Sequence, residues 1–245
     1  MKGALDLGGC FPTGRHYPGI AHLIRVVVQG LASEFESERP VRGIPWVAID
    51  TETTGRDAEN DRVVEIGCVA FVDGAVVDRK SWLINPGRPI PADATAVHGI
   101  SDDDVRDQPA IAEVFPEVLE FVAARLPLAY NADFDRRFLL AELGRSGMPA
   151  ELPPAFRPDV VWLDPLSWAR ELQKEEKSRA LGDVTARLGI ALERAHRATD
   201  DAEAAGQVLV HFLSDPRVPS TYGAFLREQL RLERLFEFER GRWRS

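Results

Sequence analysis

The stretch Val-Ala-Ile-Asp-Thr-Glu-Thr-Thr-Gly at residues 47–55 determines the fold and the chemistry that we expect of this chain. Its apolar start is typical of a buried strand. Because successive strand side chains point to opposite faces, Asp50 and Glu52 share one face while Thr51 points away. Two carboxylates this close repel each other, which raises the pKa of one of them unless a cation lies between them. Ligands that are all oxygen favour Mg²⁺ or Mn²⁺ over zinc. A solvated turn after a strand has the same composition, so residues further along the chain must decide between the two.

The chain has 245 residues, 44% of them apolar and 28% charged, which suits one domain with extensions or two small domains. Its two cysteines, Cys10 and Cys68, are too few for a disulfide framework and lack the spacing of a metal site. The first residues lack the apolar segment of a secretory signal, and no apolar run approaches the ~18 residues of a membrane span. We therefore expect a cytoplasmic protein that does not enter a membrane.

The net charge of −9 argues against a general affinity for the phosphate backbone of nucleic acids. Carboxylates that hold metal ions contribute to this charge, and the bound cations would bridge them to phosphate. A protein that grips only the end of a nucleic acid also needs few phosphate contacts. The charge therefore predicts modest, salt-sensitive affinity rather than tight duplex binding.

Hydrophobic periodicity predicts an α/β domain with helical extensions at both ends. Three hairpin-linked strands, with a tight turn at Asp73-Gly74, precede alternating helices and strands, which indicates a mixed sheet. The boundaries follow as an N-terminal tail and amphipathic helix at 1–44, a main domain at 45–214 and a C-terminal helical extension at 215–245. The expected strands are 46–50, 62–72, 75–84, 126–130 and a fifth at 160–163. The expected helices are 20–35, 111–124, 133–146, 165–172, 179–188, 201–213 and 221–238, with a charged linker at 36–45.

A second acidic group occurs where a strand is expected to run into a helix, in Ala-Tyr-Asn-Ala-Asp-Phe-Asp at residues 129–135. Active sites of open α/β sheets gather at the carboxyl ends of strands, so this group and the first can meet. Asn131 and Asp133 are also suitable helix N-caps, and Asp135 falls in the first turn, where the helix dipole stabilises a carboxylate. The residues alone do not choose between Asp133 and Asp135 as a functional acid.

The third group is His-Arg-Ala-Thr-Asp-Asp-Ala-Glu at residues 196–203. On one helix His196 and Asp201 would be about 140° apart, so they converge only if His196 lies on a loop and Asp201 on the helix that follows. Asp200 with Glu203 resembles a capping box that would start this helix. A histidine titrates near neutral pH and can take a proton from water, although a solvated loop histidine is the simpler interpretation of this residue alone.

Together, Asp-x-Glu, an aspartate at a strand-to-helix turn and His-x4-Asp resemble the DEDDh exonucleases, which include the DnaQ-like proofreading subunit of bacterial replicative polymerase and RNase T. Glu65-Ile66-Gly67 and the segment at 96–101 belong to the resemblance, which runs from Trp46 to Leu213. Tyr130 departs from it, since many relatives place histidine before the asparagine. The resemblance implies an RNase H-like fold with a mixed five-stranded sheet. It also implies two divalent cations, Mg²⁺ or Mn²⁺, held by Asp50, Glu52, Asp135 and Asp201, with His196 as the general base.

The resemblance further implies that substrate is contacted by Thr53, Gly55, His98, Asn131 and Phe134. A loop-ordering role for His98 and a core position for Phe134 are the alternatives. The implied activity is a 3′–5′ exonuclease that releases nucleoside 5′-monophosphates, with a DNA 3′ end more in keeping than RNA. RNA 3′-end trimming is one alternative, because the 2′-hydroxyl is read by geometry that the sequence does not reveal. Another is a nuclease fold that binds a polymerase or repair partner through its terminal helices. A transposase-like Asp-Asp-Glu site is disfavoured by the final His-x4-Asp.

Overall fold

A four-stranded mixed sheet forms the centre of the described part of the chain, which in the computed structural model comprises residues 30–147, 151–192 and 197–242. The strands are β1 (Trp46–Thr53), β2 (Val63–Val72), β3 (Ala75–Leu83) and β4 (Leu126–Leu128), in the order β3-β2-β1-β4. The first three are antiparallel and β4 runs parallel to β1. Asp73 and Gly74 form the hairpin turn with positive φ angles of 51° and 79°. This fits the tight turn expected from an Asp-Gly pair, since both residue types accept positive φ. The mixed α/β sheet is therefore confirmed.

The prediction of a fifth strand at 160–163 is wrong for the described residues. Leu163 forms only an isolated parallel bridge to Leu128. Two neighbours prevent extension of this pairing: the Val161 N–H donates to the Gly30 carbonyl at 2.9 Å, and Asp164 caps the next helix at once. Residues 160–163 thus join two different parts of the fold and extend the sheet by one bridge.

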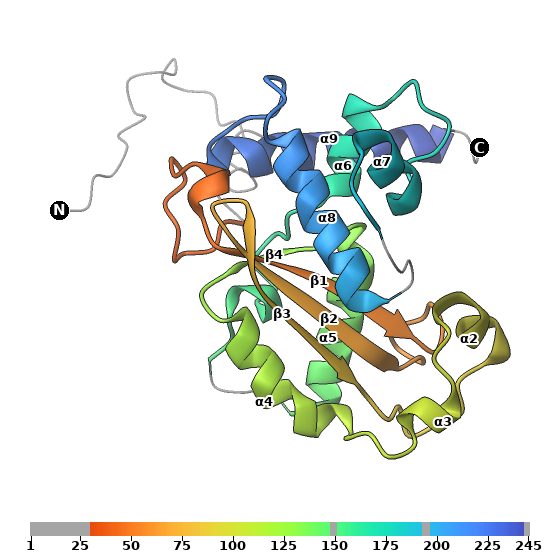
Figure 1. Cartoon of the computed structure of the whole chain (residues 1–245). Coiled ribbons are helices and arrows are strands. Elements are labelled where there is room, and N and C mark those ends of the chain that lie inside the picture. Colours follow the sequence, from red (N-terminus) through yellow and green to blue (C-terminus); the bar gives the residue numbers. More distant parts are fainter. Residues whose placement is uncertain (1–29, 148–150, 193–196, 243–245) are drawn as a thin grey trace, which may run out of the picture.

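Helices cover both faces of the sheet (Figure 1). Alternate residues of β1 divide between the two sides, because Trp46 and Ala48 belong to one hydrophobic cluster and Val47 and Ile49 to another. The first cluster includes residues of α6, α8 and α9, and the second includes residues of α4 and α5. The helices are α2 (Ala92–His98), α3 (Asp102–Val105), α4 (Ile111–Val122), α5 (Ala132–Ser146), α6 (Pro165–Leu172), α7 (Leu181–Leu188), α8 (Ala198–Phe212) and α9 (Tyr222–Arg242).

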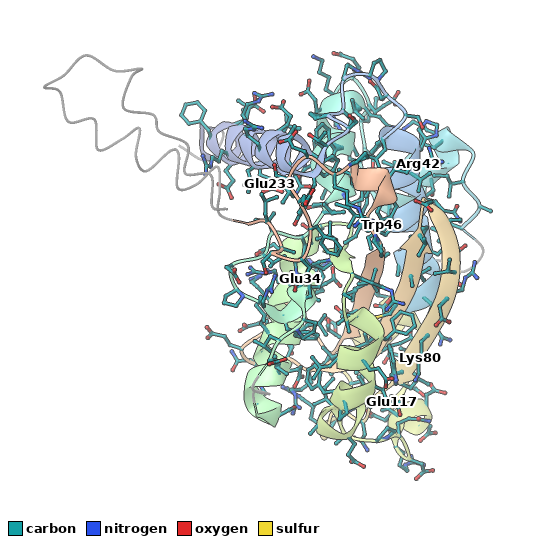
Figure 2. The ribbon with its side chains drawn as sticks, turned by 90° about the vertical axis from the view of Figure 1, so that its left-hand side faces the viewer. Glu34, Arg42, Trp46, Lys80, Glu117 and Glu233 are labelled. Atoms are coloured by element: carbon teal, nitrogen blue, oxygen red, sulfur yellow. The ribbon has the colours of Figure 1, made fainter. Side chains whose placement is uncertain are left out.

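The edge strand β3 is tied to α4 by polar contacts. Lys80 and Trp82 both donate to the Glu117 carboxylate, at 2.6 Å and 3.1 Å. Figure 2 shows Lys80 and Glu117 close together at this edge of the sheet. Charged side chains on an edge strand also disfavour pairing with strands of other molecules. Among the described helices, none is both long and apolar enough to cross a membrane.

The segment before β1 packs against the last helix. Residues 1–29 lie outside the described part, and with them most of the helix expected at 20–35; residues 30–35 are not helical, so that end of the prediction is wrong. The expected linker at 36–45 contains two fully buried side chains, Val41 and Ile44, and Pro40 bridges Thr221 at the start of α9. The Ala32 N–H donates to the Tyr222 hydroxyl at 2.9 Å. These contacts make α9 part of the same hydrophobic core as α6 and α8.

Candidate active site

Three carboxylates meet where β1 passes beneath the start of α8. Asp50 and Glu52 lie on one face of β1, opposite Gly67 and Glu65 of β2. Asp201 comes from the first turn of α8, which crosses that face. Oxygens of Asp50, Glu52 and Asp201 lie within 4.8 Å of one another. Asp50 and Glu52 share one face, as strand alternation predicts. Both lie close to Asp201, as the family resemblance implies.

Asp135 reaches the same region from the other side of the sheet. It lies in the first turn of α5, is 3% exposed, and its Oδ1 accepts the Thr51 backbone N–H at 2.9 Å and the Thr51 hydroxyl at 2.8 Å. Thr51 points away from Asp50 and Glu52, as expected, and thereby holds this acid. Asp133 instead pairs with Arg137 at 3.0 Å, and its side chain is 76% exposed. The structure therefore separates the two aspartates that the sequence left open.

Burial and mutual repulsion make this group of carboxylates unfavourable in its charged form. Burial raises the pKa of Asp50 well above its usual value, and Asp135, Asp201 and Glu52 raise it further. The pKa of Glu52 is raised to about 8, mainly by burial and next by repulsion from the Asp201 carboxylate. Burial also raises the pKa of Asp135 to about 7, although the bonds from Thr51 oppose the shift. Hard divalent cations bind such all-oxygen sets and reverse this repulsion, so the donor set fits Mg²⁺ or Mn²⁺.

An ion pair from β2 fixes the start of α8. The buried Glu65 carboxylate accepts from Arg197 Nη2 at 3.0 Å and Nε at 3.3 Å, from the Ala198 N–H at 3.3 Å, and from the Ser81 hydroxyl at 2.7 Å. Because a carboxylate at a helix N-terminus satisfies free N–H groups and the helix dipole, Glu65 acts as the cap of α8. The capping box predicted for Asp200 with Glu203 is wrong: α8 begins earlier, at Ala198, and its N-cap Arg197 makes no side-chain cap bond.

Gly67 allows α8 to approach the sheet closely. A Cβ at Gly67 would lie 2.2 Å from the Ala198 carbonyl carbon and 2.3 Å from the Thr199 nitrogen, far inside normal contact. Only glycine therefore permits this separation between β2 and the turn that carries Asp201. Glu65 and Gly67 are neighbours on the face that Asp50 and Glu52 also share.

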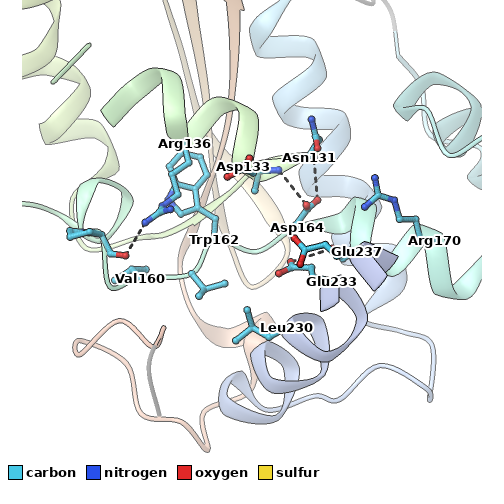
Figure 3. A pocket seen from close by; sticks show the side chains of 14 residues that line it. Asn131, Asp133, Arg136, Val160, Trp162, Asp164, Arg170, Leu230, Glu233 and Glu237 are labelled. Atoms are coloured by element: carbon cyan, nitrogen blue, oxygen red, sulfur yellow. Dashed lines mark hydrogen bonds between the residues drawn. The ribbon is translucent and has the colours of Figure 1, made fainter. Parts of the chain in front are cut away.

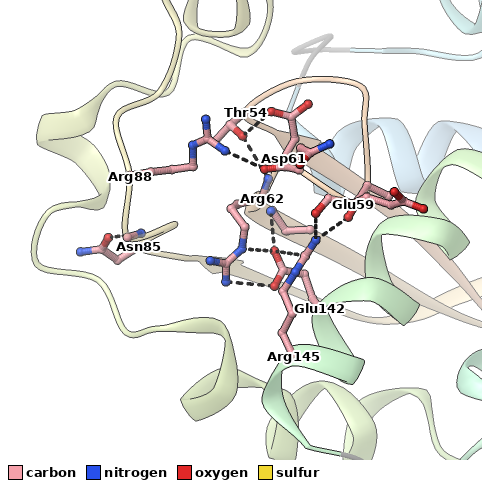
Figure 4. Close-up of polar contacts among 12 residues, drawn as sticks. Thr54, Glu59, Asp61, Arg62, Asn85, Arg88, Glu142 and Arg145 are labelled. Carbon is pink, nitrogen blue, oxygen red and sulfur yellow. Dashed lines mark hydrogen bonds and ion pairs between the residues drawn. The ribbon is translucent and has the colours of Figure 1, made fainter.

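The loop after β1 is held by a buried carboxylate on α5 (Figure 4). Glu142, which is fully buried, accepts from Arg62 Nε at 2.7 Å and Nη2 at 3.0 Å and from the Val63 N–H at 3.2 Å. Arg145 donates to the carbonyls of Ala58 and Glu59 at 2.6 Å and 2.8 Å. Charge-assisted bonds of this kind are stronger than neutral ones and fix the loop at 54–62 beside the carboxylates.

The residues expected to contact substrate are placed as follows. Thr53 is buried, and its hydroxyl donates to the carbonyl of Gly55 at 2.5 Å. His98 is buried, and its Nδ1 accepts the Ile100 N–H at 3.0 Å, as a loop-ordering residue would. Asn131 is exposed at the start of α5, while Phe134 is half-buried against Phe138 with ring centroids 4.9 Å apart. His196, the expected base, lies outside the described residues.

A family model described as "Exonuclease" matches residues 47–209, which include Asp50, Glu52, Asp135 and Asp201. The chain belongs to the DEDDh exonuclease family. The resemblance stated from the motifs is thereby confirmed, and the domain is a 3′–5′ exonuclease of DnaQ type, a phosphodiester hydrolase.

Among known proteins, this DEDDh domain is similar to the PolC-type DNA polymerase III of Clostridium perfringens, at 35% identity over 75% of this chain. The match covers 12% of that polymerase, so the chain spans only a small part of such relatives. Its fold is similar to Exonuclease X in complex with 5′ overhanging duplex DNA, with 27% identity, a TM-score of 0.56, and 71% and 95% of the two chains covered. It is also similar to the nuclease domain of 3'hExo bound to rAMP, with 17% identity, a TM-score of 0.60, and 73% and 96% covered.

Proposed function

We propose that this protein removes nucleoside 5′-monophosphates from the 3′ end of DNA, single-stranded or frayed, in a reaction that depends on divalent cations. The observation that carries the proposal is the meeting of Asp50, Glu52 and Asp201 within 4.8 Å. Three buried or half-buried carboxylates this close repel one another, and divalent cations bound between them would offset that repulsion.

Asp50, Glu52, Asp135 and Asp201 would hold two divalent cations, and Asp50 is central to the group because the other three carboxylates all raise its pKa. When bound, two such ions stabilise both the attacking and the leaving oxygen of an in-line phosphoryl displacement. His196 is proposed to take a proton from the attacking water. The water oxygen then bonds to the terminal phosphorus while the bond to the 3′ oxygen of the preceding nucleotide breaks, and that oxygen takes a proton from solvent to become the new 3′-hydroxyl.

Several residues of the chain prepare this reaction. Thr51 orients Asp135 through two hydrogen bonds, and Glu65 fixes Arg197, the neighbour of His196. Thr53, Gly55 and the rigid loop after them lie directly beyond the carboxylates of β1, where the terminal nucleotide would lie. Pre-organised supports of this kind reduce the reorganisation needed in the transition state.

DNA is proposed as the substrate because the relative with 35% identity is a DNA polymerase and the structure with 27% identity holds duplex DNA. RNA 3′-end trimming is the second candidate, favoured by the fold shared with the 3'hExo domain that binds rAMP. Because the relative with 35% identity is a DNA polymerase, we also propose that the chain serves a polymerase or repair complex in proofreading.

The test compares single-stranded DNA, a duplex with a mismatched 3′ end, and RNA of the same sequence, each with Mg²⁺ or Mn²⁺. Wild type should degrade the two DNA substrates faster than RNA, and Asp50→Asn should degrade none of them. Faster cleavage of RNA would replace the DNA proposal by the RNA one. Equal, slow degradation by wild type and Asp50→Asn would refute both.

A further inference from the structure

Gln229, in the middle of α9, is a fully buried polar residue that contacts the segment before α6. Its Oε1 accepts the Asp164 N–H at 3.0 Å. Its Nε2 donates to the Trp162 carbonyl at 2.9 Å and to Glu233 Oε1 at 2.9 Å. A buried amide with each of these bonds made is costly to remove, since its partners would be left unsatisfied. Gln229 therefore fixes the backbone on both sides of Leu163.

The residue that Gln229 holds is in turn the cap of α5. The Asp164 carboxylate accepts the Asn131 N–H at 3.0 Å and the Ala132 N–H at 3.3 Å, and Figure 3 shows it facing Asn131. It also caps its own helix through the Leu166 N–H at 2.9 Å. Asn131 has a left-handed φ of 70° and makes no side-chain cap bond. A non-glycine residue in this conformation needs support from its surroundings, and Asp164 provides it.

The first turn of α5 that Asp164 supports is the turn that carries Asp135. Asp135 lies four residues after Asn131, and its carboxylate must meet Thr51 at 2.8–2.9 Å. A displacement of the helix start would move it away from the other acids. A continuous set of hydrogen bonds thus runs from α9 through Asp164 to the turn that carries an active-site carboxylate.

We propose that Gln229 is a positioning residue for Asp135, and that α9 is part of the catalytic unit rather than a detachable extension. The inference rests on the proposed function, in which Asp135 holds a divalent cation. Residues that hydrogen-bond a metal ligand typically contribute 10–100-fold to metal affinity or activity, and Gln229, which acts through Asp164, is expected at the lower end of that range. Loss of the Gln229 contacts should therefore appear in metal binding and turnover more than in substrate affinity.

The test replaces Gln229 by methionine, which has a similar volume and none of the hydrogen bonds. Tyr222→Phe is the matched control, because it removes a buried hydrogen bond of α9 that leads to Ala32 and not to Asp164. We expect Gln229→Met to raise the half-saturating Mn²⁺ concentration and lower kcat by about 10-fold or more, with KM for a single-stranded oligonucleotide unchanged. Hydrogen exchange at residues 131–135 should also become faster. Tyr222→Phe should lower only Tm.

Equal losses of kcat and Mn²⁺ affinity in the two variants at equal Tm would overturn the proposal, as would an unchanged exchange rate at residues 131–135 in Gln229→Met. Gln229→Leu serves if the methionine variant does not fold, since it also lacks both the donor and the acceptor, and the same losses are expected. If wild type itself cleaves no oligonucleotide, the proposed function fails. Mn²⁺ affinity and hydrogen exchange then still decide whether Gln229 positions Asp135.

Discussion

Replacing Gly67 by alanine tests whether the close contact of α8 with β2 sets the position of Asp201. The added Cβ would lie 2.2 Å from the Ala198 carbonyl carbon, and an ordinary contact begins near 3.4 Å. The first turn of α8 must therefore move by about 1 Å, because backbone atoms cannot rotate aside as a side chain can. A misplacement of about 1 Å in a catalytic group can cost about 10²-fold in rate, and overpacking costs about 1–3 kcal/mol in stability.

The assay measures kcat on a single-stranded DNA oligonucleotide with Mg²⁺, together with Tm. Gly206→Ala is the control: Gly206 lies on α8, the helix that carries Asp201, and its added Cβ would meet ring atoms of Phe71 at 2.3 Å rather than backbone. Both variants should lose stability, and only Gly67→Ala should lose about 10²-fold in kcat. Wild-type turnover in Gly67→Ala, or an equal loss in both variants, would refute the idea that this contact places Asp201.

Three further predictions concern the carboxylates themselves. Thr51→Val removes the hydroxyl that donates to Asp135 and should lower kcat about 10-fold, whereas Thr51→Ser retains a hydroxyl and should keep the wild-type kcat. The measurement is steady-state kinetics, and equal kcat values for the two variants would contradict the role of the hydroxyl. In the metal-free folded protein the pKa is raised to about 8 for Glu52 and to about 7 for Asp135. At pH values between the ordinary carboxyl pKa and these raised values, the folded protein therefore binds more protons than the unfolded chain. Tm should accordingly fall as pH rises from 5 to 8. Mg²⁺ should flatten this dependence in thermal unfolding scans; a Tm that rises with pH in the metal-free protein would contradict the account. Asp50→Asn removes a carboxyl group whose ionisation is opposed by burial and by its neighbours, so it should abolish cleavage and make the Tm of the metal-free protein fall less as pH rises; an unchanged pH dependence would count against that repulsion.

The sequence predicted the parts of the site that depend on local spacing. Asp50 and Glu52 were placed on one face because strand side chains alternate, and the hairpin at Asp73-Gly74 follows from residues that accept positive φ. Asp135 and Asp133 could not be separated, because the choice depends on how α5 is rotated relative to Thr51 of β1, 84 residues earlier. That rotation is a property of packing.

Long-range contacts explain the remaining differences. The start of α8 was placed too late because its cap is Glu65, which lies 133 residues before Ala198. A signal was nevertheless present, since Glu65 is a single carboxylate in a strand of buried apolar residues and such a charge requires a partner. The link from Gln229 to Asp164 had no such signal, because one glutamine on a mixed helix face resembles a solvated residue. The prediction of a fifth strand failed because four consecutive apolar residues do not reveal where their backbone groups form hydrogen bonds. Here those bonds go to two different neighbours.

The proposed function requires these carboxylates to hold divalent cations for cleavage at a 3′ end. The decisive measurement is a time course on single-stranded DNA with a label on the 3′-terminal nucleotide, with Mg²⁺ or with EDTA. Labelled nucleoside 5′-monophosphate should be the first and only labelled product, EDTA should abolish its release, and Asp50→Asn should release none. Labelled products longer than one nucleotide, or the same rate in EDTA or in Asp50→Asn, would contradict the proposed function.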